Sequence, residues 1–156
     1  MNEFTAKKLG EVLAFATVGK ETFEKGREAM SSVLGKEMVE NYIMEYDKHS
    51  EEISKIAKNS KVEDIVTKKL KGTGKKLREM RDLYVGKEWD NSTELLEWSG
   101  FFEGAATVHW SLVKGAGQAT NHDEITELSD KALVLHQGLL ERATALLHEV
   151  GKKKSV

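Results

Sequence analysis

The sequence predicts an all-α protein that folds as an antiparallel up-and-down bundle of four to five long helices. The first observation is that the 156 residues include no proline, where average usage would give about eight, and proline is the residue that helix interiors tolerate least. The second is that apolar and small residues recur at alternating spacings of three and four, which is typical of helices packed at shallow angles. At this length we expect one domain, covering residues 1–156.

Glycine and cap-forming residues divide the chain into the predicted helices. Gly35 and Gly86 each follow an apolar-periodic segment, and glycine adopts the left-handed conformation that commonly ends a helix. Ser60 and Glu63 have the spacing of a capping box for the helix that follows. Helices of about 25 residues are ~38 Å long, and the short connections between them favour an up-and-down bundle. The predicted helices cover residues 3–34, with an alternative break at Gly19, and residues 36–58, 61–85, 93–118 and 122–150.

The composition excludes several classes of protein. The 24 basic and 26 acidic residues give a net charge of −2, so the basic surplus typical of nucleic-acid-binding proteins is missing and we expect no nucleic-acid partner. The chain contains no cysteine, which excludes disulfides, a thiolate nucleophile and a cysteine-ligated metal.

No segment of the sequence is typical of membrane insertion or secretion. Residues 1–10 contain no apolar run of the kind found in signal peptides. The most apolar stretch, residues 95–119, contains Glu97, Glu103 and Lys114, and a charged group at the centre of a bilayer costs about 2.5–3.5 kcal/mol even on the most lenient scale. We therefore expect a soluble cytoplasmic protein with no membrane partner.

Three of the five histidines lie on the predicted apolar lines of three different helices, so their imidazoles could converge in the bundle interior. Two carboxylates are four residues before and three residues after one of them, which places them on adjoining helix surface. Nitrogen and oxygen ligands of this kind suit iron, manganese or zinc. The alternative is that each histidine is a hydrogen-bonded core or boundary residue. The candidate ligands are His49, Glu45, Glu52, Glu103, His109 and His136.

The segment Tyr-Ile-Met-Glu-Tyr-Asp-Lys-His-Ser-Glu-Glu-Ile, residues 42–53, resembles the second core helix of ferritin-like proteins. The resemblance implies a ferritin-like helical bundle with a metal centre in its interior. That family carries Glu-x-x-His on two helices and a single Glu on each of the other two. Here the residue three before His49 is Tyr46, the residue three before His136 is Leu133, and no Glu-x-x-His occurs. The resemblance therefore implies a di-iron site that is lost or rebuilt from the candidate ligands, without ferroxidase or oxygenase activity of the ordinary kind.

Five of the eleven aromatic residues fall between Trp89 and Trp110. Within this segment Gly100 and Gly104 are four residues apart, which leaves a smooth patch on one helical face, and Phe101 lies beside it. Three interpretations stay open. The helix is the most surrounded one of the bundle, or the patch borders a small-ligand pocket, or it is a self-association face. Because surplus apolar faces are often buried by dimerisation, we expect a homodimer.

The segment 61–85 carries a basic stripe, for which a solvated helix face is the simplest interpretation and phosphate binding the alternative. The fragment Gly72–Lys76 lacks the full phosphate-loop pattern, and neither a Gly-x-Ser-x-Gly elbow nor a His-Glu-x-x-His zinc motif occurs. The sequence thus leaves two function hypotheses: a bundle that binds a metal ion or small ligand in its interior, and a non-enzymatic scaffold that acts as a homo-oligomer.

Overall fold

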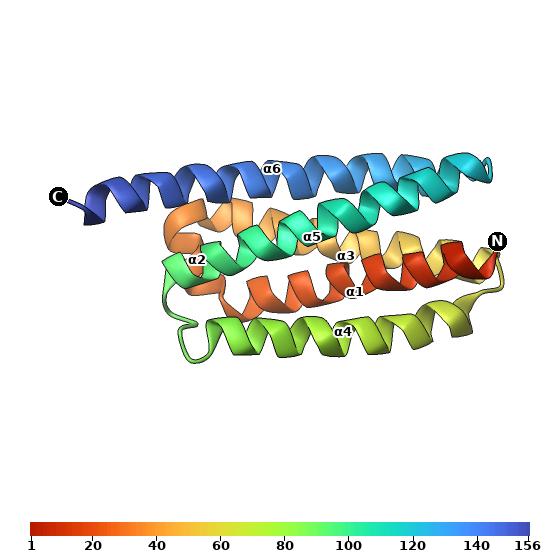
Figure 1. Ribbon diagram of the computed structural model, residues 1–156, viewed down its shortest axis with the longest axis horizontal. Coiled ribbons are helices and arrows are strands. Elements are labelled where there is room, and N and C mark those ends of the chain that lie inside the picture. Colours follow the sequence, from red (N-terminus) through yellow and green to blue (C-terminus); the bar gives the residue numbers. More distant parts are fainter.

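The computed structural model describes residues 1–156 as six α-helices with no β-strand, and 88% of the residues are helical. The prediction of an all-α fold is confirmed, and the six helices are five long ones and the short α2. Five long helices lie along a common direction, and the short α2 connects the first two of them (Figure 1). The helices are α1 (Glu3–Lys25), α2 (Arg27–Leu34), α3 (Lys36–Asn59), α4 (Glu63–Val85), α5 (Ser92–Ala119) and α6 (Asp123–Lys154). None of them is both long enough and apolar enough to cross a membrane.

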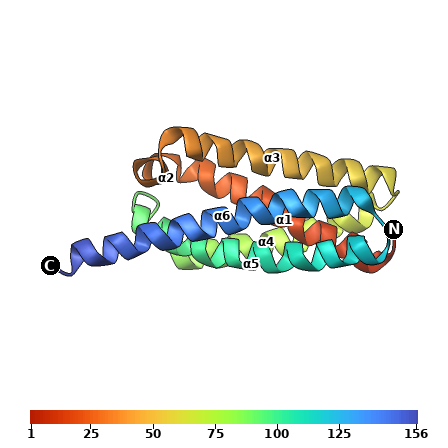
Figure 2. The same cartoon turned by 90° about the horizontal axis from the view of Figure 1, so that it is seen from above.

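The helix at the centre of the packing is α1. It contacts α2, α3, α4 and α5, whereas α6 packs mainly on α5. Successive long helices reverse direction along the chain, but the neighbours α1 and α4 run the same way (Figure 1). The interpretation of the aromatic-rich segment as the most surrounded helix is wrong, because α1 buries a larger share of its residues than α5 does. In Figure 2, α5 lies along one edge of the bundle.

The first predicted helix breaks at Gly26 and not at Gly19. Gly19 lies inside α1, and a Cβ placed on it would be 2.9 Å from Cζ of Tyr46. Glycine at this position serves the close approach of α1 and α3. A Cβ on Gly26 would lie 2.9 Å from Cδ1 of Leu95, so the break between α1 and α2 lies directly against α5.

The other helix ends follow the sequence prediction in part. Gly35 and Gly86 adopt positive φ angles of 87° and 57° after α2 and α4, as expected for glycine at a helix end. The predicted capping box of Ser60 and Glu63 is wrong. The residue that precedes α4 is Val62, and no side chain caps this helix. Ser60 instead follows the last residue of α3, and its backbone N–H bonds to that helix.

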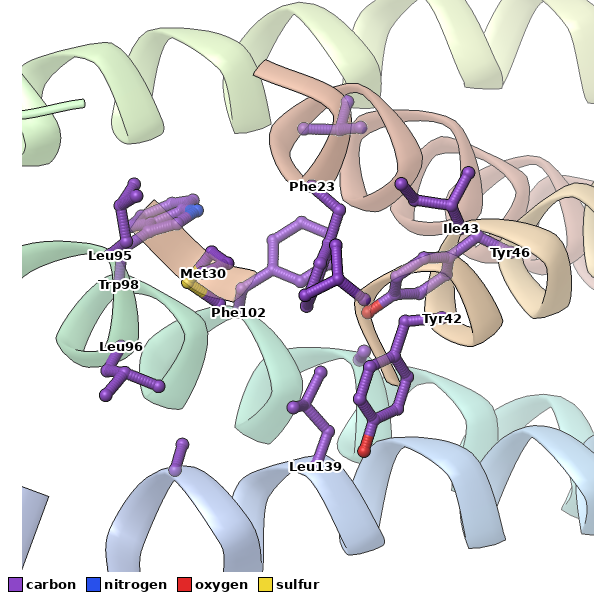
Figure 3. Close-up of a cluster of buried hydrophobic side chains, with 14 of the residues drawn as sticks. Phe23, Met30, Tyr42, Ile43, Tyr46, Leu95, Leu96, Trp98, Phe102 and Leu139 are labelled. Carbon is purple, nitrogen blue, oxygen red and sulfur yellow. The ribbon is translucent and has the colours of Figure 1, made fainter. Parts of the chain in front are cut away.

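The apolar core consists of two clusters, of 20 and 14 buried residues. The larger one is rich in aromatic rings. Figure 3 shows Phe23, Phe102 and Tyr46 gathered between the helices, with Leu139 reaching in from α6. The smaller cluster surrounds the fully buried Trp110. Polar side chains from three helices lie where the two clusters meet.

Candidate functional site

Four buried polar side chains come together in the bundle interior, and we call them the polar core cluster. Tyr46 and His49 come from α3, Glu103 from α5 and His136 from α6. All four are almost completely shielded from solvent. The aromatic ring of Tyr46 lies 5.8 Å from that of His136, and the His49 ring lies 5.9 Å from Trp110, so the cluster contacts both apolar clusters.

The carboxylate of Glu103 is the centre of the cluster. The Tyr46 hydroxyl donates to its Oε1, and Nδ1 of His136 bonds to its Oε2. A carboxylate oxygen accepts but does not donate, which assigns the proton of this second bond to Nδ1. Burial, and then the negative charge of Glu103, raise the pKa of Tyr46 well above its ordinary value, so the phenol keeps its proton. The two hydrogen bonds thus give both oxygens of the Glu103 carboxylate a donor. Burying a carboxylate without such donors would cost free energy.

His49 is beside this hydrogen-bonded trio but is not part of it. Its ring centre lies 6.3 Å from that of His136, and its Nδ1 is buried without a hydrogen-bond partner. Burial, and then the electrostatic influence of the neighbouring His136, lower the pKa of His49 to about 4. The imidazole is therefore neutral at physiological pH, with a lone pair on one of its nitrogens.

Packing from α1 holds the Tyr46 ring in place. Gly19 leaves room for the hydroxyl end of the ring, since an added Cβ would lie 2.9 Å from Cζ and 3.0 Å from Cε1 of Tyr46. The Phe23 ring centre lies 5.9 Å from that of Tyr46. These contacts hold the ring where its hydroxyl donates to Glu103 on α5.

His109 belongs to a different site. Its Nδ1 lies 3.1 Å from Oε2 of Glu11, whose carboxylate also accepts from Lys8 and forms an ion pair with Lys69. Burial alone would raise the pKa of Glu11, but the hydrogen bonds from Lys69 and Lys8 outweigh it and lower that pKa. This half-buried group of charges ties α1 to α4 and α5, away from His136 and Glu103.

Two further candidate ligands lie at the surface of α3. Glu45 forms an ion pair with Lys48 at 2.6 Å, and Glu52 lines a shallow depression between α3 and α6 together with Lys131. Of the six candidates, the structure thus brings together His49, Glu103 and His136 and leaves the other three apart. No group of three or more histidine, aspartate or glutamate side chains is arranged to hold a metal ion.

Sequence reasoning missed two members of these sites. Tyr46 is three residues before His49 and so shares its helix face, a spacing that could have indicated a partner for a buried carboxylate. Glu11 gives no such signal, because its partners come from α4 and α5 as well as from its own helix.

The polar core cluster lies apart from the main depressions of the surface. None of the five main pockets is lined by Tyr46, His49, Glu103 or His136. Each of these four side chains is at most 3% exposed. Comparison with protein-family models, with curated proteins and with solved structures finds no match for this chain.

Proposed function

We propose that the protein is a non-enzymatic helical scaffold that works by self-association and that its polar core cluster serves the fold. One observation carries this proposal. The outward side of α5 presents Phe101, Val108 and Leu112, which are 65%, 69% and 44% exposed. Exposed apolar residues that line up along one side of a helix are typical of an interaction surface. Apolar residues that are scattered singly over the surface are common in monomers.

The chemistry of the interior supports the same proposal. Tyr46, Glu103 and His136 satisfy one another's hydrogen bonds in a region that excludes water. A fully satisfied buried network rigidifies a core and favours one packing arrangement over its alternatives. We expect this network to hold α3, α5 and α6 in one register, and so to keep the outer side of α5 in a fixed orientation.

Sedimentation equilibrium with two matched variants tests the proposal. Val108→Asp places a charge on the outer side of α5, and Val134→Asp makes the same change at a valine of α6 that is 74% exposed. We expect the unmodified chain and Val134→Asp to form dimers, and Val108→Asp to stay monomeric. A proposal of self-association through α5 fails if both variants associate equally, or if the unmodified chain stays monomeric at high micromolar concentration.

A second candidate function is metal binding, and the unpartnered Nδ1 of His49 favours it. His49 and His136 are neighbouring imidazoles, and Glu103 holds the ring of His136 as outer carboxylates commonly hold metal-bound histidines. The bundle would then be a ferritin-like one with a rebuilt site for iron, manganese or zinc. Metal analysis of protein purified without an affinity tag tests this. Less than about 0.1 metal per chain, with no rise in melting temperature on adding these ions, contradicts it, since a ligand of the native state must stabilise that state.

A further inference from the structure

We infer that two copies of this chain pair through α5 in antiparallel orientation, about a two-fold axis that passes beside Val108. Phe101 of each copy lies against the partner's Gly115, and Leu112 lies against the partner's Gly104. The inference rests on the proposed self-association and adds the surface, the orientation and the register of the pair. We call the five residues that carry it the α5 face, and they are Phe101, Gly104, Val108, Leu112 and Gly115.

The spacing along the α5 face is symmetric. Its successive residues are three, four, four and three positions apart, which keeps them on one side of a helix. Reversing the helix about Val108 superposes Phe101 on Gly115 and Leu112 on Gly104. Each large side chain of one copy therefore lies opposite a glycine of the other copy, where no side chain occupies the space. An isologous interface requires this property, because the same patch must be complementary to itself.

Glycines of the α5 face are not explained by packing within the chain. A Cβ added at Gly104 or Gly115 would meet no atom within 4 Å, whereas at Gly10 and Gly19 it would lie 2.6 Å and 2.9 Å from a neighbouring helix. A glycine inside a helix costs about 0.5–1 kcal/mol relative to alanine. The two open glycines thus lower the stability of the isolated chain, and because they alternate with Phe101, Val108 and Leu112 they leave space that a second α5 can fill.

Within the span of the α5 face, from Phe101 to Gly115, the ionisable groups of α5 are directed away from it. Between Trp98 and Ala119 the helix has only three, which are Glu103, His109 and Lys114. Glu103 is buried in the polar core cluster, His109 bonds to Glu11, and Lys114 forms an ion pair with Asp130 of α6 at 2.7 Å. A two-fold axis brings like residues together, so a face without charge avoids the repulsion that a charged one would suffer.

The available area indicates a dimer that dissociates. From Phe101 to Gly115 the helix is about 21 Å long and ~10–12 Å wide, which gives roughly a third of the ~800 Å² per partner that a stable interface buries. The exposed Tyr84 of α4 extends the apolar surface at one end, where its ring lies 5.3 Å from that of Phe101. Figures 1 and 2 show α5 in the outer layer, where a second copy has access to it.

Cysteine cross-linking tests the register without background, because the chain has no cysteine of its own. In Val108→Cys the two new thiols lie next to each other across the axis, so mild oxidation should give a covalent dimer. The control is Val134→Cys, at a valine of similar exposure on α6, which should give no covalent dimer under the same conditions. Phe101→Cys should not cross-link to itself, since the antiparallel pair separates the two copies by about 21 Å along the helices. It should cross-link when mixed with Gly115→Cys.

The possible outcomes separate this inference from the proposed function. Cross-linking of Val108→Cys and of the mixed pair, but not of Phe101→Cys alone, supports the antiparallel register. Self-cross-linking of Phe101→Cys overturns it in favour of a parallel pair. If sedimentation shows a dimer and Val108→Cys does not cross-link, the register is wrong while self-association stands. If the unmodified chain is monomeric and Val108→Cys does not cross-link, both proposals fail.

Discussion

Replacing Glu103 by leucine removes the centre of the polar core cluster. Leucine fills much of the same volume, so the substitution isolates the loss of hydrogen bonding from the creation of a cavity. The Tyr46 hydroxyl and Nδ1 of His136 would then be buried without partners. We expect Glu103→Leu to lower the free energy of unfolding more than most single substitutions of the polar residues of this chain.

The expected loss of stability follows from the two buried groups, the Tyr46 hydroxyl and Nδ1 of His136, that lose their hydrogen-bond partner. Leaving a buried donor unsatisfied costs about 1–3 kcal/mol, so the two together predict a loss of roughly 2–6 kcal/mol. For a chain of this length, 1 kcal/mol corresponds to ~2–4 °C in melting temperature. Glu103→Gln should cost less, about 1–2 kcal/mol, because its amide accepts from Tyr46 through oxygen and donates through nitrogen to His136 in the other tautomer.

Urea unfolding followed by circular dichroism at pH 7 measures both variants, and Tyr46→Phe serves as the test of mechanism. In the Glu103→Leu background, Tyr46→Phe removes one stranded hydroxyl and should restore about 1 kcal/mol or more, whereas in the unmodified chain the same change should destabilise. The effect of Tyr46→Phe on the free energy of unfolding should therefore differ in sign between the two backgrounds. This difference reports the hydrogen bond between Tyr46 and Glu103. The reasoning is refuted if Glu103→Leu unfolds within about 0.5 kcal/mol of the unmodified chain, or if Tyr46→Phe has the same effect in both backgrounds.

Two further perturbations act on the same cluster. Because the pKa of His49 is lowered to about 4 in the folded chain, the unfolded chain binds more protons between pH 4 and about 6.5. Stability should be full above pH ~6.5 and fall by up to ~3 kcal/mol as the pH drops toward 4. Urea midpoints at pH 7 and 4.5 measure the fall, which should be smaller in His49→Phe, and an identical fall in that variant would contradict the assignment. Gly19→Ala should cost about 1–3 kcal/mol because its Cβ would lie 2.9 Å from Tyr46. Gly72→Ala, where the same Cβ meets nothing, should leave thermal stability equal or higher, and equal melting temperatures for the two variants would count against the packing at Gly19.

The helical architecture was readable from the sequence because its signals are local. The absence of proline and the glycines at positions 35 and 86 act on the chain within a few residues of themselves. The break at Gly26 was not readable, since Gly19 and Gly26 look alike in sequence and differ only in the distant residues they contact. The capping box was predicted wrongly because Ser60 follows the last residue of α3, so it ends that helix and does not begin α4.

Three of the six candidate ligands lie in the polar core cluster and three lie elsewhere, for a similar reason. His49 and His136 lie on amphipathic helices, whose apolar lines indicate the inward direction. His109 lies on α5, which is apolar on several sides, so periodicity does not show which side faces inward. It faces Glu11 instead of the polar core cluster. Tyr46 lies on the same side of its helix as His49, and its hydroxyl acquires a role only because α5 brings a carboxylate to it.

The most direct test of self-association is the mass of the unmodified chain as a function of its concentration. One chain has a mass of 17.5 kDa. Sedimentation equilibrium should show the average mass rising toward twice this value as the concentration increases through the micromolar range, and addition of salt should not reverse the rise because the α5 face carries no charge. A mass of 17.5 kDa that stays constant to several hundred micromolar would contradict the account.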